Sequence, residues 1–552
     1  MRCGRKEVEA GRKPYPHKNV TKEGGMMRKF LLYSLLPMFL GLLVLGQGVP
    51  RERTLVIATG LQPSTLDIGV GYEAAAINVN LVVYERLVRY KPGSVEVEPE
   101  LAKSWSVSPD GKVWTFELHS GIVFHDGTPC DAAAVAFSFQ RAMAINLGPA
   151  WMLEPIERVE AVDDLTVRFT LKRPYPEFLQ VLANIFGTGI VSPAAVKAHA
   201  TEDDPWAQEW LSSHMVGTGP YKFVEWVKGQ HIILRRFEDY WRGWDGVKNN
   251  IEQVIIRYIT EPSVQRLLLE RGDVDIAMDI SVDDWELLKG TPGIVLVEEP
   301  SMHATYLRFN CAAGPTADVR VRKAIRAALD YKGMIEYVLR GHAVQMQGAA
   351  AIGLPCHNNE LPLPVQDLDL ARKLLAEAGY PHGGFTLEYV YESGHEDRRR
   401  VGELLQASLA ELGIALKIIE LPWPDLWERV SAADPERTPA IVANGWWPDY
   451  ADVINFLYPM YHSSQWPPVA FNIGFYKNEE VDKLLDRAQV ETDPAVRCEL
   501  LKKAQALIYE DCPDIDLYHL TTRIALRDWV KGYVYSPIYT EGFFLYDMWL
   551  EK

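Results

Sequence analysis

The second half of the sequence alternates between segments with the pattern of a strand and segments with the pattern of a helix. Runs rich in β-branched and aromatic residues, such as 385–391 (FTLEYVY) and 414–420 (IALKIIE), are typical of strands. Between these runs, apolar residues recur at helical spacing. This alternation predicts an α/β fold with a mixed sheet. The expected strands are 304–309, 385–391, 414–420 and 439–443, and the expected helices are 319–340, 368–379, 400–412, 424–432, 478–490 and 495–510.

Strands predominate in the first half. Residues 54–59 (TLVIAT) are largely apolar and predict an opening strand that ends before Gly60 and Pro63. At 552 residues, the chain is too long for one hydrophobic core, so we expect several structural units. A helix is expected at 74–88, and alternating apolar and polar residues predict half-buried strands at 113–118, 165–171 and 231–236.

The N-terminal region has the pattern of an export signal. Arg28 and Lys29 precede the apolar run 30–46, and small residues follow it, which predicts a signal peptide at 26–48. The run is long, so an uncleaved membrane anchor is the alternative. No cysteine follows the run to accept a lipid. We therefore expect a periplasmic or cell-surface protein.

Residues 1–25 are unexpected in front of a signal peptide. The codons of Lys22-Glu23-Gly24 can contain a ribosome-binding sequence just upstream of Met26 and Met27. We therefore hypothesise that translation starts at one of these methionines and that 1–25 are a misassigned leader. The alternative is a genuine leader segment without structure.

Charge and motif content exclude several classes of function. The formal charge is −17, and it becomes about −23 once 1–48 are removed, which disfavours non-specific binding to nucleic acid. The motifs GxSxG, HExxH, SxxK and GxxxxGK[ST] are absent, which argues against a secreted hydrolase and against a phosphate-binding loop. The acidic stretch 272–284 lacks the spacing of an EF-hand loop. No cofactor or metal site is predicted.

Two further patterns are interpreted as structural. His125-Asp126 resembles a catalytic pair, but Asp126-Gly127 is a turn signal and Thr128-Pro129 leads into a helix. Five cysteines follow the leader, an odd number, so at least one thiol is unpaired and the pairing stays open. Cys130 is expected to be a small core residue.

Four segments carry a recognisable set of motifs. Residues 101–139 contain Phe124-His125-Asp126-Gly127-x-Pro, and 217–241 begin with Gly-Thr-Gly-Pro-Tyr. Residues 308–341 hold Asn310 and a Val-Arg-x-Ala helix, and 445–457 read GWWPDYADVINFL. From about residue 54 to the end, the chain resembles the family-5 extracellular solute-binding proteins of ABC importers, which include dipeptide, oligopeptide and nickel binders.

The resemblance implies a two-lobed periplasmic-binding-protein fold of the large cluster C type, with mixed sheets and an extra β-rich subdomain. It implies crossings between the lobes near 309–312 and 530–540. Lobe one is expected at 54–308 plus 536–552, with the subdomain at about 77–190, and lobe two at 312–535. A monomeric, non-enzymatic protein is implied that captures a peptide between closing lobes and delivers it to an ABC permease.

The resemblance also implies a ligand site. Asp449 matches the aspartate that holds the peptide's α-amino group, and a desolvated ammonium does need a carboxylate partner. The segment Gly445-Trp446-Trp447 follows the strand at 439–443 and can offer main-chain groups to an extended peptide. The loop Leu61-Gln62-Pro63 matches the position that contacts the ligand from the other lobe. The alternative for Asp449 is a solvated loop acid.

One position departs from the family pattern. Where dipeptide binders carry a carboxylate-binding arginine, this chain has Glu392. Either His395 or one of Arg398, Arg399 and Arg400 substitutes for it, or the ligand is not a dipeptide. Three arginines at a helix start oppose the helix dipole and suggest an anionic partner, whereas a solvated surface run is the alternative.

Tryptophans are concentrated near this segment, at 423, 427, 446, 447 and 466. Such rings form the walls of side-chain pockets or stack on sugars, so an oligosaccharide binder of the same family is the alternative function, ahead of a nickel or metal-chelate binder. Trp423 and Trp427 are four apart on an expected helix, which favours a core role. Trp446 and Trp447 are adjacent and point to opposite faces of an extended segment, so at most one, Trp446, is expected to face the ligand.

Overall fold

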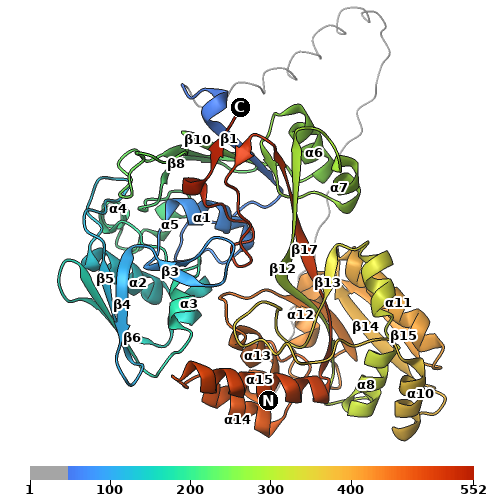
Figure 1. Cartoon of the computed structure of the whole chain (residues 1–552). Coiled ribbons are helices and arrows are strands. Elements are labelled where there is room, and N and C mark those ends of the chain that lie inside the picture. The colour runs from blue at the N-terminus through green and yellow to red at the C-terminus, as the bar shows by residue number, and fades with distance from the viewer. Residues whose placement is uncertain (1–47) are drawn as a thin grey trace, which may run out of the picture. The chain divides into compact units, whose positions relative to one another are not determined.

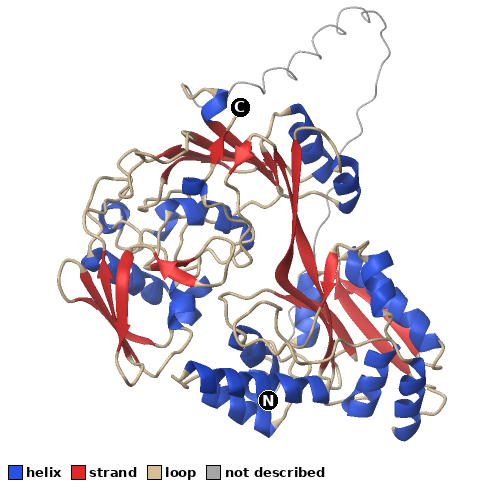
Figure 2. Cartoon of the chain, viewed as in Figure 1, coloured by secondary structure: helices blue, strands red, loops and turns tan. Residues whose placement is uncertain are grey.

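The computed structural model describes residues 48–552 and is an α/β fold, as the alternation of elements predicts. The predicted leader and all but the last residue of the predicted signal peptide lie outside the described residues. Within 48–552, none of the helices has the length and apolar character needed to cross a membrane. Figure 2 shows strands in both main groups of elements, with helices packed against them.

An eleven-stranded mixed sheet runs through the fold in the order β15-β14-β16-β12-β17-β11-β1-β10-β9-β8, and β13 pairs with β17 beside this path. Its two longest strands, β12 and β17, are antiparallel neighbours and run side by side through Figure 1. The bounds are β1 Thr54–Thr59, β8 Tyr221–Val227, β9 His231–Arg236, β10 Gln253–Tyr258, β11 Ile276–Ala277, β12 Ile294–Phe309, β13 Ala343–Gln345, β14 Thr386–Glu392, β15 Ala415–Leu421, β16 Ile441–Trp446 and β17 Asp514–Arg527.

We assign the β1 end of this sheet to lobe one. All six residues of β1 are buried: β10 and β11 pair with its two edges, and core residues cover both of its faces, with Leu55 and Ile57 in one cluster and Val56 and Ala58 in another. The helix predicted at 74–88 is shorter in the structure, where it ends at Val83. The helices here are α1 Ile77–Val83, α4 Pro193–His199, α5 Gln208–Leu211, α6 Pro262–Arg271 and α7 Val282–Leu288.

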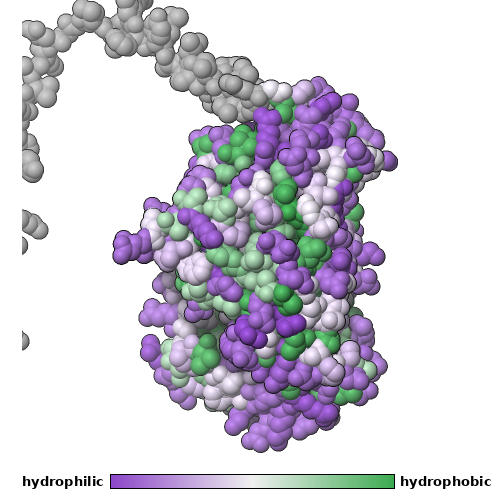
Figure 3. Space-filling view, turned by 90° about the vertical axis from the view of Figure 1, so that its left-hand side faces the viewer, coloured by the Kyte–Doolittle hydropathy of each residue, from purple (hydrophilic) through white to green (hydrophobic). Residues whose placement is uncertain are grey.

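A β-rich unit within lobe one lies in the predicted subdomain range. Its four-stranded antiparallel sheet has the order β4-β5-β7-β6 and is covered by α2. Phe116 and Phe139 both meet Phe169 edge-on in its core. The face at the left of Figure 1, turned to the viewer in Figure 3, mixes hydrophilic residues with smaller hydrophobic groups. The bounds are β2 Val88–Tyr90, β3 Val97–Pro99, β4 Ala102–Val107, β5 Val113–Leu118, α2 Ala132–Ile145, β6 Ile156–Ala161, β7 Thr166–Leu171 and α3 Phe178–Leu182.

We assign the other end of the large sheet, where β14 is parallel to both β15 and β16, to lobe two. The predicted helix at 319–340 is interrupted, because Leu329 is extended and the Asp330 carboxylate accepts a 2.8 Å hydrogen bond from Gly333 N to start a new turn. The helices are α8 Val319–Ala328, α9 Tyr331–Gly333, α10 Leu368–Glu377, α11 Glu396–Ala410, α12 Trp423–Val430, α13 Ile454–Tyr461, α14 Glu479–Ala488 and α15 Pro494–Asp511.

The pairing of β12 and β17 bears on the lobe boundaries. From Ala304 onward, β12 also pairs with β16 of lobe two, whereas Ala525 and Leu526 of β17 pair with β11 of lobe one. A register shift lies between Pro300 and Ala304. We therefore propose that both crossings lie inside these two strands, near 300–304 and 519–521, rather than at 309–312 and 530–540.

Cysteine pairing, which the sequence leaves open, is settled for one pair. Cys356 and Cys498 form a disulfide that joins a loop to α15. Within residues 48–552, Cys130, Cys311 and Cys512 are free, in agreement with the expectation of at least one unpaired thiol. Cys130 is buried in the core, as predicted, and burial raises the pKa of its thiol.

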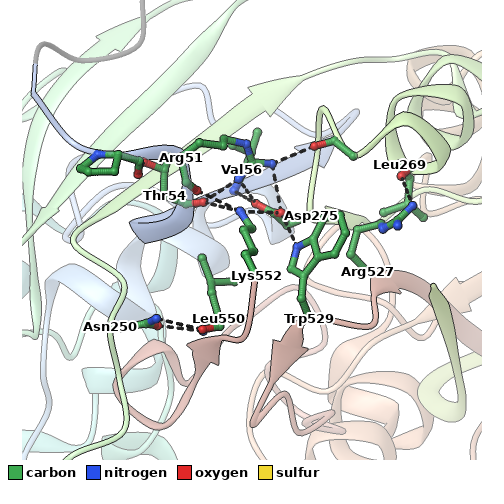
Figure 4. A network of polar contacts seen from close by, with 12 residues as sticks. Arg51, Thr54, Val56, Asn250, Leu269, Asp275, Arg527, Trp529, Leu550 and Lys552 are labelled. Carbon is green, nitrogen blue, oxygen red and sulfur yellow. Dashed lines mark hydrogen bonds and ion pairs between the residues drawn. The ribbon is translucent and has the colours of Figure 1, made fainter.

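The acidic stretch at 272–284 has a structural role. Gly272 ends α6 in a left-handed conformation, and Asp275 is fully buried. Its carboxylate accepts hydrogen bonds from Arg51 at 2.8 and 3.0 Å, Trp529 Nε1 at 2.8 Å and Val56 N at 2.8 Å, and Lys552 Nζ lies 3.0 Å away (Figure 4). Asp275 thus joins the start of the first strand to the last residue of the chain.

The turn around His125-Asp126 is also structural. Gly127 has a φ of 82°, which favours glycine, and the Asp126 carboxylate accepts hydrogen bonds from Thr128 N at 2.9 Å and Ser192 Oγ at 2.5 Å. His125 Nε2 lies 2.9 Å from the carbonyl oxygen of Gly219. These contacts agree with the turn interpretation of the motif.

We expect acid to destabilise the protein through buried His125. Burial lowers the pKa of His125 from 6.5 to about 4, so its stabilising contribution is complete above pH 6.5 and is lost as the pH falls towards 4. At pH 4 the loss reaches about 3 kcal/mol of unfolding free energy. Urea denaturation between pH 4 and 7 measures it: His125→Asn flattens the pH dependence, whereas His214→Asn at an exposed histidine leaves it unchanged. An unchanged slope in His125→Asn contradicts the prediction.

Candidate ligand-binding site

A cavity of about 1040 Å³ lies between residues of the two lobes. Volumes of this size are typical of small-molecule and peptide sites. Its lobe-one walls fall within 72–77, 151–155, 173–177 and 184–186, and its lobe-two walls within 445–450, 454–459 and 465–471. Several of these segments are loops that follow a strand, as at β7 and β16, so the sheets position the walls while the loops supply the side chains.

Asp449, which the resemblance proposes as the partner of the ligand's amino group, lines this cavity. It follows β16, and its carboxylate accepts hydrogen bonds from the Tyr72 hydroxyl and, at 3.0 Å, from Asn455 Nδ2. Its carbonyl oxygen accepts a 2.5 Å hydrogen bond from Asn184 Nδ2. Tyr72 and Asn184 belong to lobe one, so Asp449 is held by contacts from both lobes.

The electrostatics of Asp449 suit a cationic ligand group. Burial raises the pKa of Asp449, and the hydrogen bonds from Tyr72 and Asn455 oppose that rise. Burial and the neighbouring Asp449 carboxylate raise the pKa of Tyr72, which keeps its hydroxyl a donor. Within the described part of the chain, no Lys, Arg or His forms an ion pair with Asp449. An ammonium placed here would therefore meet a carboxylate that lacks a counter-charge.

Gly445 lies where two side chains approach the main chain closely. A Cβ at this position would lie 2.4 Å from His303 Nε2 and 3.1 Å from an Arg398 guanidinium nitrogen, so only glycine fits without displacement. Burial lowers the pKa of His303 to about 4, which keeps the ring neutral at pH 7. The pairing of β14 with β16 ends at Ala443, which leaves residues 444–446 unpaired with β14.

The tryptophans differ from expectation in two respects. Trp446 and Trp447 both line the cavity, although strand alternation predicts only one; β16 ends at Trp446, so alternation does not extend to Trp447. Trp423 is 47% exposed, so the core role predicted for it is wrong. Trp423 stacks on Trp427, which contacts Phe471 in the cavity wall, so this row of rings leads from the surface to the cavity.

None of the residues proposed to replace the missing arginine lines the cavity. Arg399 forms ion pairs with Glu396 and Glu403 on the exposed side of α11, and His395 lies 3.4 Å from Glu392. Helix α11 begins at Glu396, four residues earlier than predicted, so two acids precede the arginines in its first turn. The arginine run therefore needs no anionic partner, and for Arg399 the surface interpretation fits better.

The loop Leu61-Gln62-Pro63 also lies outside the cavity wall. Leu61 is 39% exposed, and the Gln62 side-chain oxygen accepts a hydrogen bond from Gly229 N. Lobe one instead contributes Tyr72, Trp151, Arg173 and Asn184. Tyr72, Arg173 and Asn184 lie in loops and Trp151 in the short 3-10 helix Gly148–Leu153, and none of them belongs to a motif, so no sequence signal marks them as site residues.

A buried ion pair network joins the lobes beside the cavity. Arg497 of α15 donates to Asp452 at 2.7 and 3.1 Å and to Glu177 of lobe one at 3.3 Å. Burial raises the pKa of Glu177 to about 7, although Arg497 opposes the shift. The lobes thus contact each other directly in this structure. Within residues 48–552, no group of three or more His, Cys, Asp or Glu is arranged to hold a metal ion.

Comparison with known proteins agrees with this arrangement. The family model "Bacterial extracellular solute-binding proteins, family 5 Middle" matches residues 96–468. The chain is 33% identical over 500 residues to the "Probable D,D-dipeptide-binding periplasmic protein DdpA" of Escherichia coli (strain K12), an alignment that covers 90% of this chain and 94% of that protein. It is 31% identical over 507 residues to "Heme-binding protein A" of Haemophilus influenzae, with 88% and 89% covered.

A solved structure shows the same fold. The ABC transporter-associated periplasmic binding protein DppA from Helicobacter pylori, in complex with the peptide STSA, has a TM-score of 0.74 and 30% sequence identity. The match covers 90% of this chain and 98% of that chain. The chain belongs to the family-5 bacterial extracellular solute-binding proteins, a family of solute-binding transporter components with the two-lobed fold that the resemblance predicts.

Proposed function

We propose that this protein is the extracytoplasmic substrate-binding component of an ABC importer and captures peptides by their free amino terminus. The observation that carries the proposal is Asp449, a half-buried carboxylate without a counter-charge in the wall of a cavity between two lobes. Closing the lobes around a ligand would bury its ammonium against this acid, where a charge-assisted hydrogen bond is strongest.

The charge of the cavity wall supports a ligand with a cationic group. Four acids line the cavity, Glu73, Glu154, Glu177 and Asp449, against the single base Arg173. Glu154 and Glu177 pair with Lys172 and Arg497. Glu73 and Asp449 are therefore the two acids without a cationic partner among the described residues, and an uncharged oligosaccharide would make no use of them. The names of two compared proteins, a D,D-dipeptide binder and a protein crystallised with the peptide STSA, point to peptides as well.

The same proposal includes location and partners. Periplasmic relatives support a periplasmic or cell-surface location, and their association with ABC transporters supports delivery to a membrane permease. We propose that a monomer binds and releases its ligand without changing it, and that no nucleic acid is involved.

A thermal-shift screen followed by calorimetry tests the proposed function. The panel holds di- to tetrapeptides including Ser-Thr-Ser-Ala, their N-acetylated forms, oligosaccharides, nickel chelates and heme. Peptides with a free amine are expected to raise the melting temperature, because a ligand at 100 times its Kd stabilises the native state by about 2.7 kcal/mol. Acetylated peptides should give little shift, and recovered peptide should be intact. A shift with sugars, chelates or heme alone would overturn the proposal.

A further inference from the structure

Arg173 is a charged side chain in the cavity wall that has no partner of its own. It lies in the loop after β7 and lines the cavity from lobe one. Within residues 48–552, its guanidinium forms no ion pair and donates no hydrogen bond, and Nη1 is buried without a partner. It lies over the Tyr175 ring, whose centre is 5.5 Å from the guanidinium carbon. Burial raises the pKa of nearby Glu177, and the charge of Arg173 opposes that rise without an ion pair to it.

Three fully buried arginines of this chain are paired. The guanidinium of Arg86 pairs with Glu100 at 2.8 Å, that of Arg141 with Asp67 at 2.6 Å, and that of Arg308 with Asp514 at 3.2 Å. A partly desolvated guanidinium without an anion or an acceptor is costly, since it has lost water contacts and gained none in return. Arg523 on β17 also lacks an ion pair among the described residues, but only Arg173 of the two lines the cavity, where a group from outside the chain can reach it.

The acids in the same wall have other partners. Glu154 forms an ion pair with Lys172 at 2.9 Å, and Glu177 pairs with Arg497 at 3.3 Å. The Glu73 carboxylate accepts hydrogen bonds from Ser64, and Asp449 accepts from Tyr72 and Asn455. Among the described residues, none of these four carboxylates forms an ion pair with Arg173, so its guanidinium is left for the contents of the cavity.

We propose that Arg173 binds a carboxylate of the ligand, so that the cavity selects compounds that carry both an ammonium and a carboxylate. The inference rests on the proposed function, because Asp449 supplies the ammonium partner. Asp449 belongs to lobe two and Arg173 to lobe one, so a zwitterionic ligand contacts one charged side chain on each lobe and favours their closure. The carboxylate is either the C-terminus of a peptide or an acidic side chain.

The arrangement also accounts for the glutamate at position 392. A carboxylate-binding group on lobe one makes an arginine at 392 unnecessary, and Glu392 itself lies outside the cavity wall. Planar guanidinium matches a carboxylate with two parallel hydrogen bonds, which lysine cannot reproduce. The substitution Arg173→Lys should therefore retain only part of the affinity.

Calorimetry with Ser-Thr-Ser-Ala and its C-terminal amide tests the inference. In the wild type, amidation is expected to weaken binding roughly 10- to 100-fold. Arg173→Gln should weaken binding of the free acid by a similar factor and bind acid and amide equally. Arg158→Gln, at an exposed arginine on β6 paired with Glu160, is the matched control and should bind as the wild type does. A peptide amide with Glu at one position, compared with Gln there, distinguishes a side-chain carboxylate from the C-terminus.

The outcomes separate this inference from the proposed function. If free-amine peptides bind the wild type but the acid-to-amide ratio is unchanged by Arg173→Gln, Arg173 does not bind the carboxylate and the peptide function stands. If no peptide binds the wild type, the proposed function and this inference both fail. Melting temperature without ligand checks folding: Arg173→Gln should not be less stable than the wild type, because it removes an unpaired charge.

Discussion

Asp449→Asn is expected to weaken the binding of a peptide with a free amino terminus by about 30-fold to several-thousand-fold. The substitution keeps the shape and the hydrogen-bonding capacity of the side chain but removes its charge. A buried ammonium without its counter-charge typically costs on the order of 2–5 kcal/mol. Asp449 has no cationic partner among the described residues. Its charge is therefore free to pair with the ligand's ammonium, and its loss should weaken ligand binding rather than break an ion pair within the protein.

A double-mutant cycle in calorimetry distinguishes a direct contact from general damage to the site. N-acetylation of the peptide should weaken wild-type binding by a factor similar to that of Asp449→Asn, and the two changes together should cost less than their sum. Asp425→Asn, at an exposed acid on the nearby helix α12, is the matched control and should not change the affinity. Full additivity in the cycle would remove Asp449 as the amine ligand.

Asp275→Ala is expected to lower the free energy of unfolding by about 3–5 kcal/mol, because removal of one member of a buried ion pair leaves uncompensated charges. Arg51 and Lys552 lose their shared carboxylate, and the donors Trp529 Nε1 and Val56 N lose their acceptor (Figure 4). Asp275→Asn keeps part of the hydrogen bonding and should cost less.

Urea denaturation at pH 7 measures this loss. Asp273→Ala is the matched control: it lies two residues away, is 39% exposed in its side chain and pairs only with Arg271, so a change below about 1 kcal/mol is expected. Equal stability of Asp275→Ala and Asp273→Ala would show that the network adds nothing to the fold. Asp275 is not in the cavity wall, so affinity measured well below the melting temperature should be unaffected.

Local patterns predict most elements of the fold correctly. The strands at 54–59, 113–118 and 231–236 have the predicted bounds, because alternation and β-branched residues act over a few neighbouring positions. The prediction is less accurate where a side chain competes locally with the helix, as Asp330 does within 319–340, or where acids extend a helix at its start, as Glu396 does in α11.

The candidate site is predictable on one side only. The segment 445–449 is contiguous, so a motif marks it, and it lines the cavity. The opposite wall is assembled from Tyr72, Arg173 and Asn184, which are far apart in the chain and carry no shared pattern. The loop at 61–63 follows a strand as a binding loop would, yet the cavity lies elsewhere.

The sequence by itself determined the α/β class, the position of most strands and helices, and the family, because periodicity and contiguous motifs are local properties. The tertiary structure alone decided which distant side chains share the cavity and which charges are left without a partner. Arg399 and Arg173 illustrate the physical reason: both are arginines after a strand, but one pairs with Glu396 and Glu403 on its own helix, whereas the other forms no ion pair with any described residue. Whether a charge is compensated depends on what packing brings within a few ångströms of it, and no local pattern records that.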